Sequence, residues 1–412
     1  MKRLLHTPEG VRDIYNVECG KKLAIESRIQ KVFHLYGYHD IQTPTFEYFD
    51  VFRKEIGTTP AKELYRFFDK EGNTLVLRPD ITPSIARVAA TLFEEEKLPI
   101  RLCYTGNTFV NHSNYQGRLR EVTQMGAELI GDDSVEADAE MLALSIETML
   151  SIGVKEFQLT VGNVDFLNSL FEDAVLDEES KERVMELVNN RNFFGVEEYL
   201  EKTHLLRSTK EAFSSLNGLV GGVEVLEKAR DIAPNSTGIM AIKRLEKIYQ
   251  ILEMYGVEKY VTFDLGMTGI HGYYTGIIFR GYTYGTGDAI IKGGRYDHLI
   301  EKFGKSSPSI GFVIVIDELM KAMMRQKLRI LYTRKNTIVL YEENRFAEAV
   351  SLVKELRSKA KNVELLKKDK GKLLEEYLNY GKEYYAGHLI YMRNYGDITM
   401  FDLVTGECKE ME

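Results

Sequence analysis

The sequence predicts an α+β fold in which an antiparallel sheet is flanked by helices, with a helical insertion and a small C-terminal α/β domain. Apolar residues follow the two-residue period of strands within 74–78, 101–130, 157–161 and 260–316. Residues 170–256 instead follow helical spacing, and the final 76 residues alternate between strands and helices. The predicted domains are a core at 1–325, with the insertion at about 170–256, and a C-terminal domain at 326–412.

Three helix boundaries can be predicted from local signals. The first helix is expected over residues 20–36, with Gly37 as its stop. Thr82-Pro83 is expected to open a second helix, with the Thr82 hydroxyl as its cap and proline at the first helical position. A third helix is expected to start at the carboxylate capping box Asp133-x-x-Glu136 and to run to about Leu150. Breaks in the insertion are expected at Asn217-Gly218, Gly221-Gly222 and Pro234.

The composition excludes several classes of protein. The 412 residues are 44% hydrophobic and 28% charged, lack tryptophan and carry a formal charge of -8, which indicates a soluble protein without general attraction to nucleic acid or anionic membranes. The longest apolar run, 310–316, is too short to span a bilayer. The three cysteines lack CxxC spacing and the eight histidines form no HxxxH or HExxH pair. The sequence therefore indicates no disulfide framework, no metal site and no cofactor, and a cytoplasmic setting is expected.

The C-terminal domain is predicted as strands at 337–341, 363–366, 388–392 and 398–403 and helices at 345–360 and 372–385. Its 12 basic and 14 acidic residues over 337–412 do not form the basic face that RNA binding requires. The connector at 321–336 contains six lysines and arginines, which a solvated helix end and linker would also explain. An RNA role for the connector stays open.

One face of the strand within 118–130 is unusually polar. With a period of two, Arg118, Arg120, Val122, Gln124, Gly126 and Glu128 share this face. A solvated sheet face could have the same pattern. The neighbouring motifs favour a ligand instead, because carboxylates with glutamine and tyrosine suit a molecule that has an ammonium group and a ring with N–H donors.

Those neighbouring motifs supply short acceptors, aromatic walls and space. Asp80 and Thr82 lie near the expected helix start, and Tyr273-Tyr274 offers rings with hydroxyls. Glycines at 281, 285, 287, 293 and 294 leave room where a ligand or another backbone comes close. Taken alone, Thr82 is expected to be a helix cap and either tyrosine a core residue.

Five motifs in order resemble the catalytic core of histidyl-tRNA synthetase, a class II synthetase. They are Leu77-Arg-Pro-Asp-Ile-Thr82, Gly117-Arg-Leu-Arg-Glu-Val-Thr-Gln-Met-Gly-Ala-Glu128, Tyr273-Tyr-Thr-Gly276, Gly293-Gly-Arg-Tyr-Asp297 and Gly311-Phe-Val-Ile-Val-Ile-Asp-Glu-Leu319. The resemblance implies a class II synthetase-like fold over about residues 5–325 and a C-terminal part like that enzyme's anticodon-binding domain. It also implies a histidine pocket formed by Asp80, Thr82, Arg120, Gln124, Glu128, Tyr273 and Tyr274.

The departures from the synthetase pattern concern its ATP-binding arginines. Phe109-Val-Asn-His112 stands where the family has Phe-Arg-x-Glu, and Glu318 stands where the third motif ends in an arginine. The family's arginine before the tyrosine pair is also missing from 267–272. Losing one preorganised cation of this kind costs ~3 kcal/mol of transition-state stabilisation, so adenylate formation is not expected. The resemblance to the synthetase therefore implies the binding of histidine without its chemistry.

Leu77-Arg-Pro-Asp-Ile-Thr-Pro83 and Tyr273-Tyr-Thr-Gly-Ile-Ile-Phe-Arg-Gly-Tyr282 resemble more closely the regulatory subunits of ATP phosphoribosyltransferase, which are paralogues of the synthetase. This resemblance implies a non-catalytic partner of the short-form catalytic subunit in the first step of histidine biosynthesis. It further implies histidine as a feedback effector and a homodimer within a hetero-oligomer. The composition gives no reason to expect a membrane or nucleic-acid partner.

Three alternatives remain. The chain could be an active histidyl-tRNA synthetase if other cations replace the missing arginines. It could be the transferase itself, although Asp132-Asp133 is not followed by the Thr- and Gly-rich loop that phosphoribosyl pyrophosphate requires. It could also be an amino-acid sensor with another partner.

Overall fold

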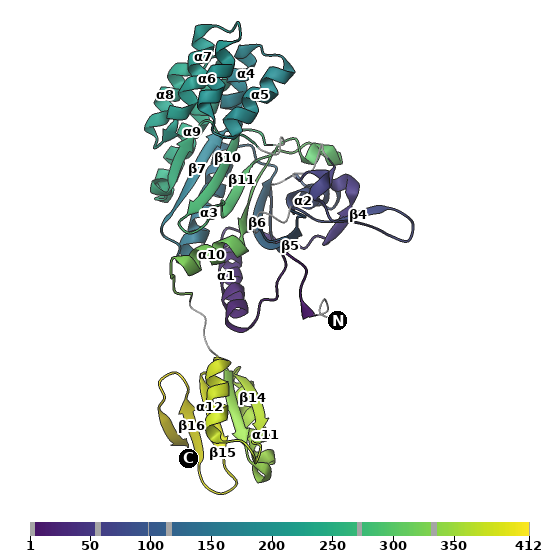
Figure 1. Cartoon of the computed structure of the whole chain (residues 1–412), viewed down its shortest axis with the longest axis vertical. Helices are drawn as coiled ribbons and strands as arrows, with labels where there is room; N and C mark the ends of the chain where they lie inside the picture. The colour runs from purple at the N-terminus through teal and green to yellow at the C-terminus, as the bar shows by residue number, and fades with distance from the viewer. Residues whose placement is uncertain are drawn as a thin grey trace. The chain divides into compact units, whose positions relative to one another are not determined.

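The computed structural model describes residues 5–53, 59–97, 99–112, 118–269, 274–330 and 336–411. The chain divides into two compact units, Met1–Asp13 with Ile25–Ile330, and Ile14–Ala24 with Leu331–Glu412 (Figure 1). Within the part of the chain that the structure describes, no helix is long and apolar enough to cross a membrane.

The first unit is built on a nine-stranded sheet with the order β1-β5-β6-β12-β11-β10-β7-β9-β8. All neighbouring strands are antiparallel except the pairs β1–β5 and β7–β9. In this order the strands are His39–Asp40, Ile100–Phe109, Glu121–Ile130, Ser309–Val315, Ile291–Arg295, Ile277–Thr283, Phe157–Asn163, Val261–Asp264 and Val220–Gly221. A smaller sheet, β2-β4-β3, contains Phe46–Tyr48, Thr74–Leu77 and Arg66–Phe68. The predicted antiparallel sheet is confirmed.

The two faces of the large sheet pack against different helices. Ile29 and Phe33 of α1 (Asn16–Leu35) and Leu142 of α3 (Val135–Ser151) share a core with Ala127 and Phe312. On the other face, α2 (Thr82–Thr91) forms a separate core whose buried residues are Ile81, Ile85, Ala86, Ala89, Ala90, Ile100, Leu102, Tyr104, Ile130, Tyr296, Leu299 and Ile300. The alternation along β5 and β6 therefore separates an apolar face under α1 and α3 from the face next to α2.

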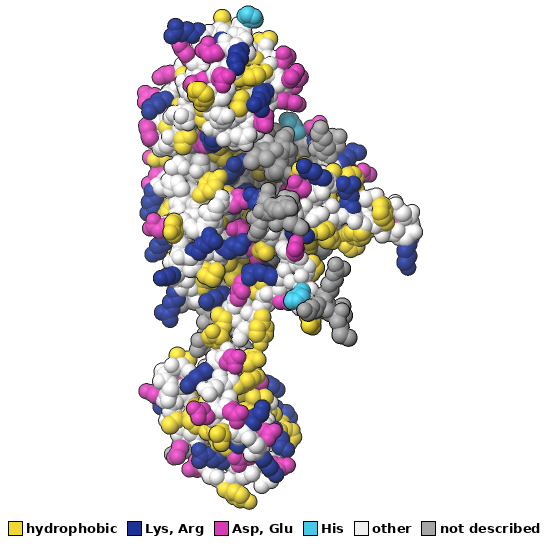
Figure 2. Space-filling view, in the orientation of Figure 1, with side chains coloured by type: hydrophobic (Ala, Val, Ile, Leu, Met, Phe, Trp, Pro, Cys, Tyr) yellow, Lys and Arg dark blue, Asp and Glu magenta, His cyan; other side chains and the backbone are white. Residues whose placement is uncertain are grey.

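The predicted helical insertion is a bundle of six helices (Figure 1). They are α4 Val164–Ala174, α5 Glu178–Asn189, α6 Phe193–Glu201, α7 Arg207–Ser215, α8 Glu224–Ile232 and α9 Ser236–Tyr255. Four of them begin after Asn163, Asp177, Asn192 and Asn235, whose side chains accept hydrogen bonds from backbone N–H groups of the first turn. Figure 2 shows side chains of both charges mixed over this bundle.

The second unit contains the predicted α/β arrangement, a five-stranded sheet with the order β14-β13-β15-β16-β17. Its strands are β13 Asn336–Tyr341, β14 Asn362–Lys367, β15 His388–Met392, β16 Ile398–Asp402 and β17 Cys408–Met411, and its helices are α11 Phe346–Ser358 and α12 Leu374–Glu383. The sequence did not predict β17, because this short edge strand is polar and mostly exposed. Val339 faces one apolar core and Ile338 and Leu340 face the other, so β13 is buried on both sides.

Two predicted helix caps are wrong. Helix α2 does begin at Thr82 with proline in its first turn, but the Thr82 hydroxyl donates to the Glu128 carboxylate at 2.9 Å instead of capping the helix. Helix α3 is capped by Ser134, whose hydroxyl accepts from Ala137 N at 3.1 Å, and not by Asp133. At α3 the cap is the serine one position further along the chain, and at α2 the predicted capping hydroxyl is bonded to a buried carboxylate of β6.

Candidate functional site

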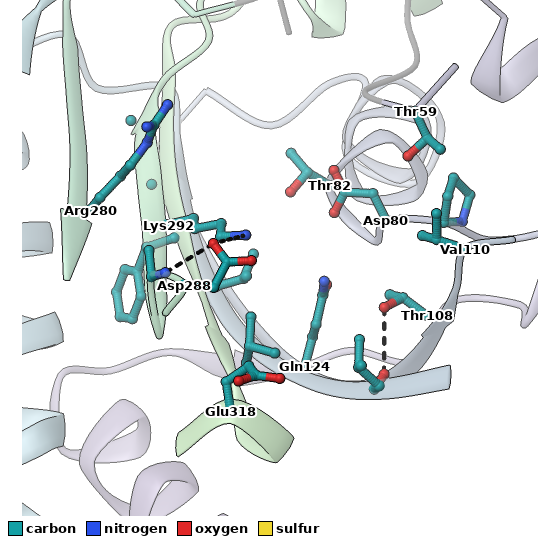
Figure 3. Close-up of a pocket in the computed structure, with 18 of the residues that line it drawn as sticks. Thr59, Asp80, Thr82, Thr108, Val110, Gln124, Arg280, Asp288, Lys292 and Glu318 are labelled. Carbon is teal, nitrogen blue, oxygen red and sulfur yellow. Dashed lines mark hydrogen bonds and ion pairs between the residues drawn. The ribbon is translucent and has the colours of Figure 1, made fainter. Parts of the chain in front are cut away.

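A cavity of about 510 Å³ lies on the α2 face of the large sheet, lined from α2, β5, β6, β10, β11 and β12 and from α10 (Ile316–Arg325). Its walls include Asp80, Thr82, Arg120, Gln124, Glu128 and Tyr274 of the predicted histidine pocket. Tyr273 lies outside the described residues. Figure 3 places Asp80 and Thr82 on one side of the cavity and Asp288 and Lys292 on the other, with Gln124 between them.

The polar face of β6 is confirmed. Gln124 and Glu128 line the cavity, whereas Met125, Ala127 and Leu129 lie in the core under α1 and α3. The pairing with β5 sets Glu128 opposite Leu102 and Gly126 opposite Tyr104. Because Gly126 has no side chain, the Tyr104 ring can cross it; a Cβ there would lie 2.4 Å from that ring.

Glu128 is a fully enclosed carboxylate of the cavity, with only 1% of its surface exposed. Its Oε1 accepts from the hydroxyls of Thr82 at 2.9 Å and Tyr104 at 3.2 Å, and its Oε2 accepts from the hydroxyl of Tyr296 at 2.6 Å. Burial raises the pKa of Tyr104 and Tyr296 well above their usual range, so both phenols stay protonated donors. Three hydroxyl donors therefore fix this carboxylate in one orientation.

Burial raises the pKa of Glu128 to about 7, the nearby charge of Asp80 adds to this, and the hydrogen bonds from Tyr296 and Thr82 oppose it. The pair of carboxylates, Asp80 and Glu128, makes the inner end of the cavity electronegative when both are ionised. A bound cation would favour the ionised form of Glu128, so the site suits an ammonium group.

This raised pKa predicts a pH-dependent stability. The folded protein binds the Glu128 proton more tightly than the unfolded chain does, so the stabilisation is fully present below about pH 4.5 and is lost as the pH rises through about 7. We expect the free energy of unfolding to lose about 2 kcal/mol from this group between pH 5 and pH 7. Denaturant unfolding of the wild type and Glu128→Gln at both pH values measures it, because the isosteric variant lacks this titration. If the free energy of unfolding changed by the same amount between pH 5 and pH 7 in both proteins, the prediction would be contradicted.

Gln124 provides an acceptor that still needs a donor. Its Oε1 is buried, and no hydrogen-bond partner for it lies among the described residues. Buried polar atoms are nearly always paired with protein, water or a ligand. Gln124 lines the cavity between Asp80 on one side and Asp288 on the other (Figure 3), so water or a donor group of a bound molecule could satisfy this oxygen.

Of the five glycines predicted to leave room, Gly293 and Gly294 line the cavity, and Gly311, which was not among them, also lines it. A Cβ on Gly294 would lie 2.7 Å from the Tyr274 ring, and a Cβ on Gly311 would lie 1.5 Å from Glu128 Oε2. At these two positions glycine leaves the space that the side chains of Tyr274 and Glu128 occupy.

The outer part of the cavity contains cations that the sequence analysis did not select, Arg280 and Lys292. Asp288 faces both Lys292 at 3.8 Å and Arg118 at 3.6 Å, and Arg280 donates to the Thr268 carbonyl at 3.4 Å. The signal for both was available, since Arg280 lies two residues after Ile278 and Lys292 two residues before Gly294 on strands with the same period. The cavity therefore has a buried carboxylate at its inner end, and its more exposed part carries four cations, Arg118, Arg120, Arg280 and Lys292, together with the carboxylates of Glu63, Asp288 and Glu318.

Arg120 is anchored by the N-terminal segment. Its backbone N–H donates to the Gly10 carbonyl at 2.7 Å, and a Cβ on Gly10 would lie 2.6 Å from Arg120 Cγ. Its guanidinium donates to the His112 carbonyl at 3.4 Å. Burial lowers the pKa of His112, and the charges of Arg118, Arg120 and Lys292 lower it further against the effect of Glu63.

The positions that depart from the synthetase pattern also line the cavity. Val110 and His112 lie at the end of β5, and Glu318 lies in the first turn of α10, where its carboxylate accepts from Lys321 at 2.6 Å. At two of these positions the cavity wall therefore carries an apolar side chain and a carboxylate.

Known proteins resemble both the sequence and the fold. A family model described as histidyl-tRNA synthetase matches residues 10–319. An ATP phosphoribosyltransferase regulatory subunit of Acetivibrio thermocellus is 41% identical, with 88% of this chain and 86% of that protein covered. One from Ruminiclostridium cellulolyticum is 38% identical, with 97% and 95% covered.

Solved structures give the same result. A crystal structure from Bacillus halodurans, described as an ATP phosphoribosyltransferase regulatory subunit/histidyl-tRNA synthetase, superposes with a TM-score of 0.86 at 31% identity and covers 95% of this chain and 99% of its own. A histidyl-tRNA synthetase from a Nostoc species superposes with a TM-score of 0.82 at 20% identity, covering 98% and 96%, which is a likeness of fold.

The fold, the cavity and these matches define a class II synthetase-like protein of the histidyl-tRNA synthetase type. Within that class, the chain belongs to the family of ATP phosphoribosyltransferase regulatory subunits.

Proposed function

We propose that this chain is the non-catalytic regulatory subunit of a short-form ATP phosphoribosyltransferase, and that it binds histidine in the cavity and transmits feedback inhibition. The observation that carries the ligand assignment is the set of acceptors in the cavity: the buried Gln124 Oε1, which has no partner among the described residues, and the carboxylates of Asp80 and Glu128. Histidine offers an α-ammonium group and a ring N–H to such acceptors.

The outer end of the cavity supports the same ligand. The α-carboxylate of histidine needs a cation, and Arg120, Arg280 and Lys292 line that end. Asp288 already faces Lys292, whereas Arg280 donates to the neutral carbonyl of Thr268, so Arg280 is a stronger candidate than Lys292 for this contact. Tyr274 lines the wall between the two ends and offers an aromatic surface to the imidazole.

The lack of catalysis is proposed from the charge at the synthetase's ATP-binding positions. Glu318 and Val110 cannot stabilise the negative charge that develops on a phosphoryl group during adenylate formation. A carboxylate near the γ-phosphate would repel ATP. We infer that the cavity has kept amino-acid binding and lost adenylate formation.

Feedback inhibition then requires two states of a complex between this chain and the catalytic subunit. Histidine must bind one state more tightly, because a ligand with equal affinity for both shifts neither. We propose that the chain works in the cytoplasm as a homodimer within this hetero-oligomer.

The decisive experiment is an ATP phosphoribosyltransferase assay of a short-form catalytic subunit from the same source, with and without this chain, across a histidine titration. We expect activity to require the chain and to fall as histidine rises. If the chain has no effect on a catalytic subunit that is competent with another regulatory partner, the proposed function is wrong.

An active synthetase is the second candidate, and the cations in the more exposed part of the cavity are the observation that favours it. Arg280 and Lys292 could replace the missing arginines. Histidine-dependent ATP–pyrophosphate exchange tests this candidate directly. Exchange above background would support it, and its absence in a protein that binds histidine would exclude it.

A further inference from the structure

Three side chains that bind metals in other proteins meet on the α1 face of the large sheet, the face opposite the cavity. His34 comes from the last turn of α1, Asp40 from the edge strand β1 and Cys103 from β5. One ligand atom of each lies within 4.8 Å of the others. Their separation in the sequence hides this cluster from any search for CxxC or HxxxH spacing.

The local fold explains why they meet. Strand β1 pairs in parallel with β5, and the pairing sets Asp40 beside Cys103. The turn between α1 and β1 passes through Gly37, whose φ of 79° suits glycine, and it returns the chain so that His34 faces Asp40. His34 Nε2 lies 2.9 Å from Asp40 Oδ2, and the Cys103 thiol donates to Asp40 Oδ1 at 3.5 Å.

The accessibility of the three groups is also suitable. Cys103 is buried, whereas the side chains of His34 and Asp40 are 46% and 54% exposed, so an ion can enter and water can occupy a remaining position. Gln30 lies one turn before His34 and donates its amide to Asp40 Oδ1 at 2.9 Å. This contact orients the carboxylate from outside the trio, as supporting residues do in metal sites.

We propose that His34, Asp40 and Cys103 bind a divalent zinc ion. Imidazole nitrogen, carboxylate oxygen and thiolate sulfur are the three ligand types of zinc, and a thiolate disfavours Mg²⁺ and Ca²⁺. Zinc bonds of about 2.0–2.3 Å place tetrahedral donors roughly 3.3–3.7 Å apart. Here the Asp40 oxygens lie 2.9 Å from His34 Nε2 and 3.5 Å from Cys103 Sγ, and all three ligand atoms lie within 4.8 Å, so the two half-exposed side chains would have to adjust. Three protein ligands leave a fourth position for water.

Zinc binding would also change the charge of the cluster. Burial raises the pKa of Cys103 to about 12, and the neighbouring Asp40 charge contributes. The metal-free thiol therefore keeps its proton, which the ion must displace when it binds. In return, the ion would link the end of α1 to two strands of the sheet, so bound zinc is expected to raise the midpoint of thermal unfolding.

The test is a titration of the metal-free, full-length protein with Co²⁺ as a spectroscopic probe, followed by competition with zinc against a chromogenic chelator. We expect one ion per chain, a thiolate-to-cobalt charge-transfer band, and about 100-fold or more loss of zinc affinity in Cys103→Ser. His34→Gln and Asp40→Asn, at half-exposed positions that tolerate substitution, should each weaken binding as well. Cys19→Ser and Cys408→Ser are matched controls that should keep the band.

Two results would overturn the proposal. One is no uptake of a stoichiometric ion by the wild type. The other is a band and affinity that survive in Cys103→Ser, or in both His34→Gln and Asp40→Asn, because the ion would then be bound elsewhere. Circular dichroism and histidine binding check that each variant is folded.

Discussion

Replacing Asp80 by asparagine is expected to lower the affinity for histidine about 100-fold. Asp80 lines the inner end of the cavity and is only partly exposed, so its charge acts on a bound ammonium with little screening by water. Losing a charged acceptor from a buried ion contact costs about 1.5–3 kcal/mol, of which each 1.4 kcal/mol is tenfold in affinity. Asparagine keeps the oxygen that accepts from Ile81 N at 2.7 Å, so the start of α2 should be preserved.

Calorimetry of histidine binding measures this effect, and the concentration of histidine that half-inhibits the complex should rise by the same factor. Asp288→Asn is the matched control, because Asp288 lines the opposite end of the same cavity next to Lys292 and Arg118. Removing that carboxylate should leave the affinity unchanged or raise it. Equal weakening by both substitutions would mean that the cavity acts only through its net charge, and unchanged affinity in Asp80→Asn would reject the assignment of the ammonium site.

The sequence predicted the polar face of β6 because one simple rule, the period of two, decides it. Since Met125, Ala127 and Leu129 are apolar, only one orientation of the strand buries them, and Gln124 and Glu128 must then face the other way. The antiparallel sheet, the helical insertion and the C-terminal α/β domain were predictable for the same reason. Each depends on a periodicity within a short stretch of chain.

The hydroxyl donors to Glu128 could not be predicted in this way. Tyr104 lies on β5 and Tyr296 directly follows β11, so their contacts with Glu128 depend on the pairing of four strands, β5, β6, β12 and β11. The sequence around Thr82 predicted a helix cap, but the Thr82 hydroxyl donates to the Glu128 carboxylate instead. A buried charge that needs donors outweighs a cap worth about 1 kcal/mol.

The cluster of His34, Asp40 and Cys103 was missed because sequence searches for metal sites rely on spacing. Its residues belong to one helix and two strands, and only the parallel pairing of β1 with β5 brings two of them together. A parallel pair of this kind leaves no short-range signal. The cations Arg280 and Lys292 could have been predicted. The period of two that was applied to β6 also places them on the cavity face of their own strands.

Gly311→Ala is expected to destabilise the protein by about 3 kcal/mol or more and to abolish measurable histidine binding. Gly311 lies opposite Glu128 in the pairing of β12 with β6. A Cβ would lie 1.5 Å from Glu128 Oε2 and 3.0 Å from the Ala127 carbonyl. The carboxylate cannot move aside without breaking its hydroxyl bonds, so the variant combines overpacking with loss of hydrogen bonds to a buried charge.

Denaturant unfolding and calorimetry measure the two effects, and Gly287→Ala is the control, since a Cβ there meets no described atom within 4 Å. That substitution should change stability by no more than about 0.5 kcal/mol. A double variant identifies the cause: combining Gly311→Ala with Glu128→Ser removes the clashing carboxylate, so the two stability losses should be smaller together than their sum. Strict additivity would show that the new methyl group clashes with the backbone instead, and that Gly311 does not make room for the carboxylate.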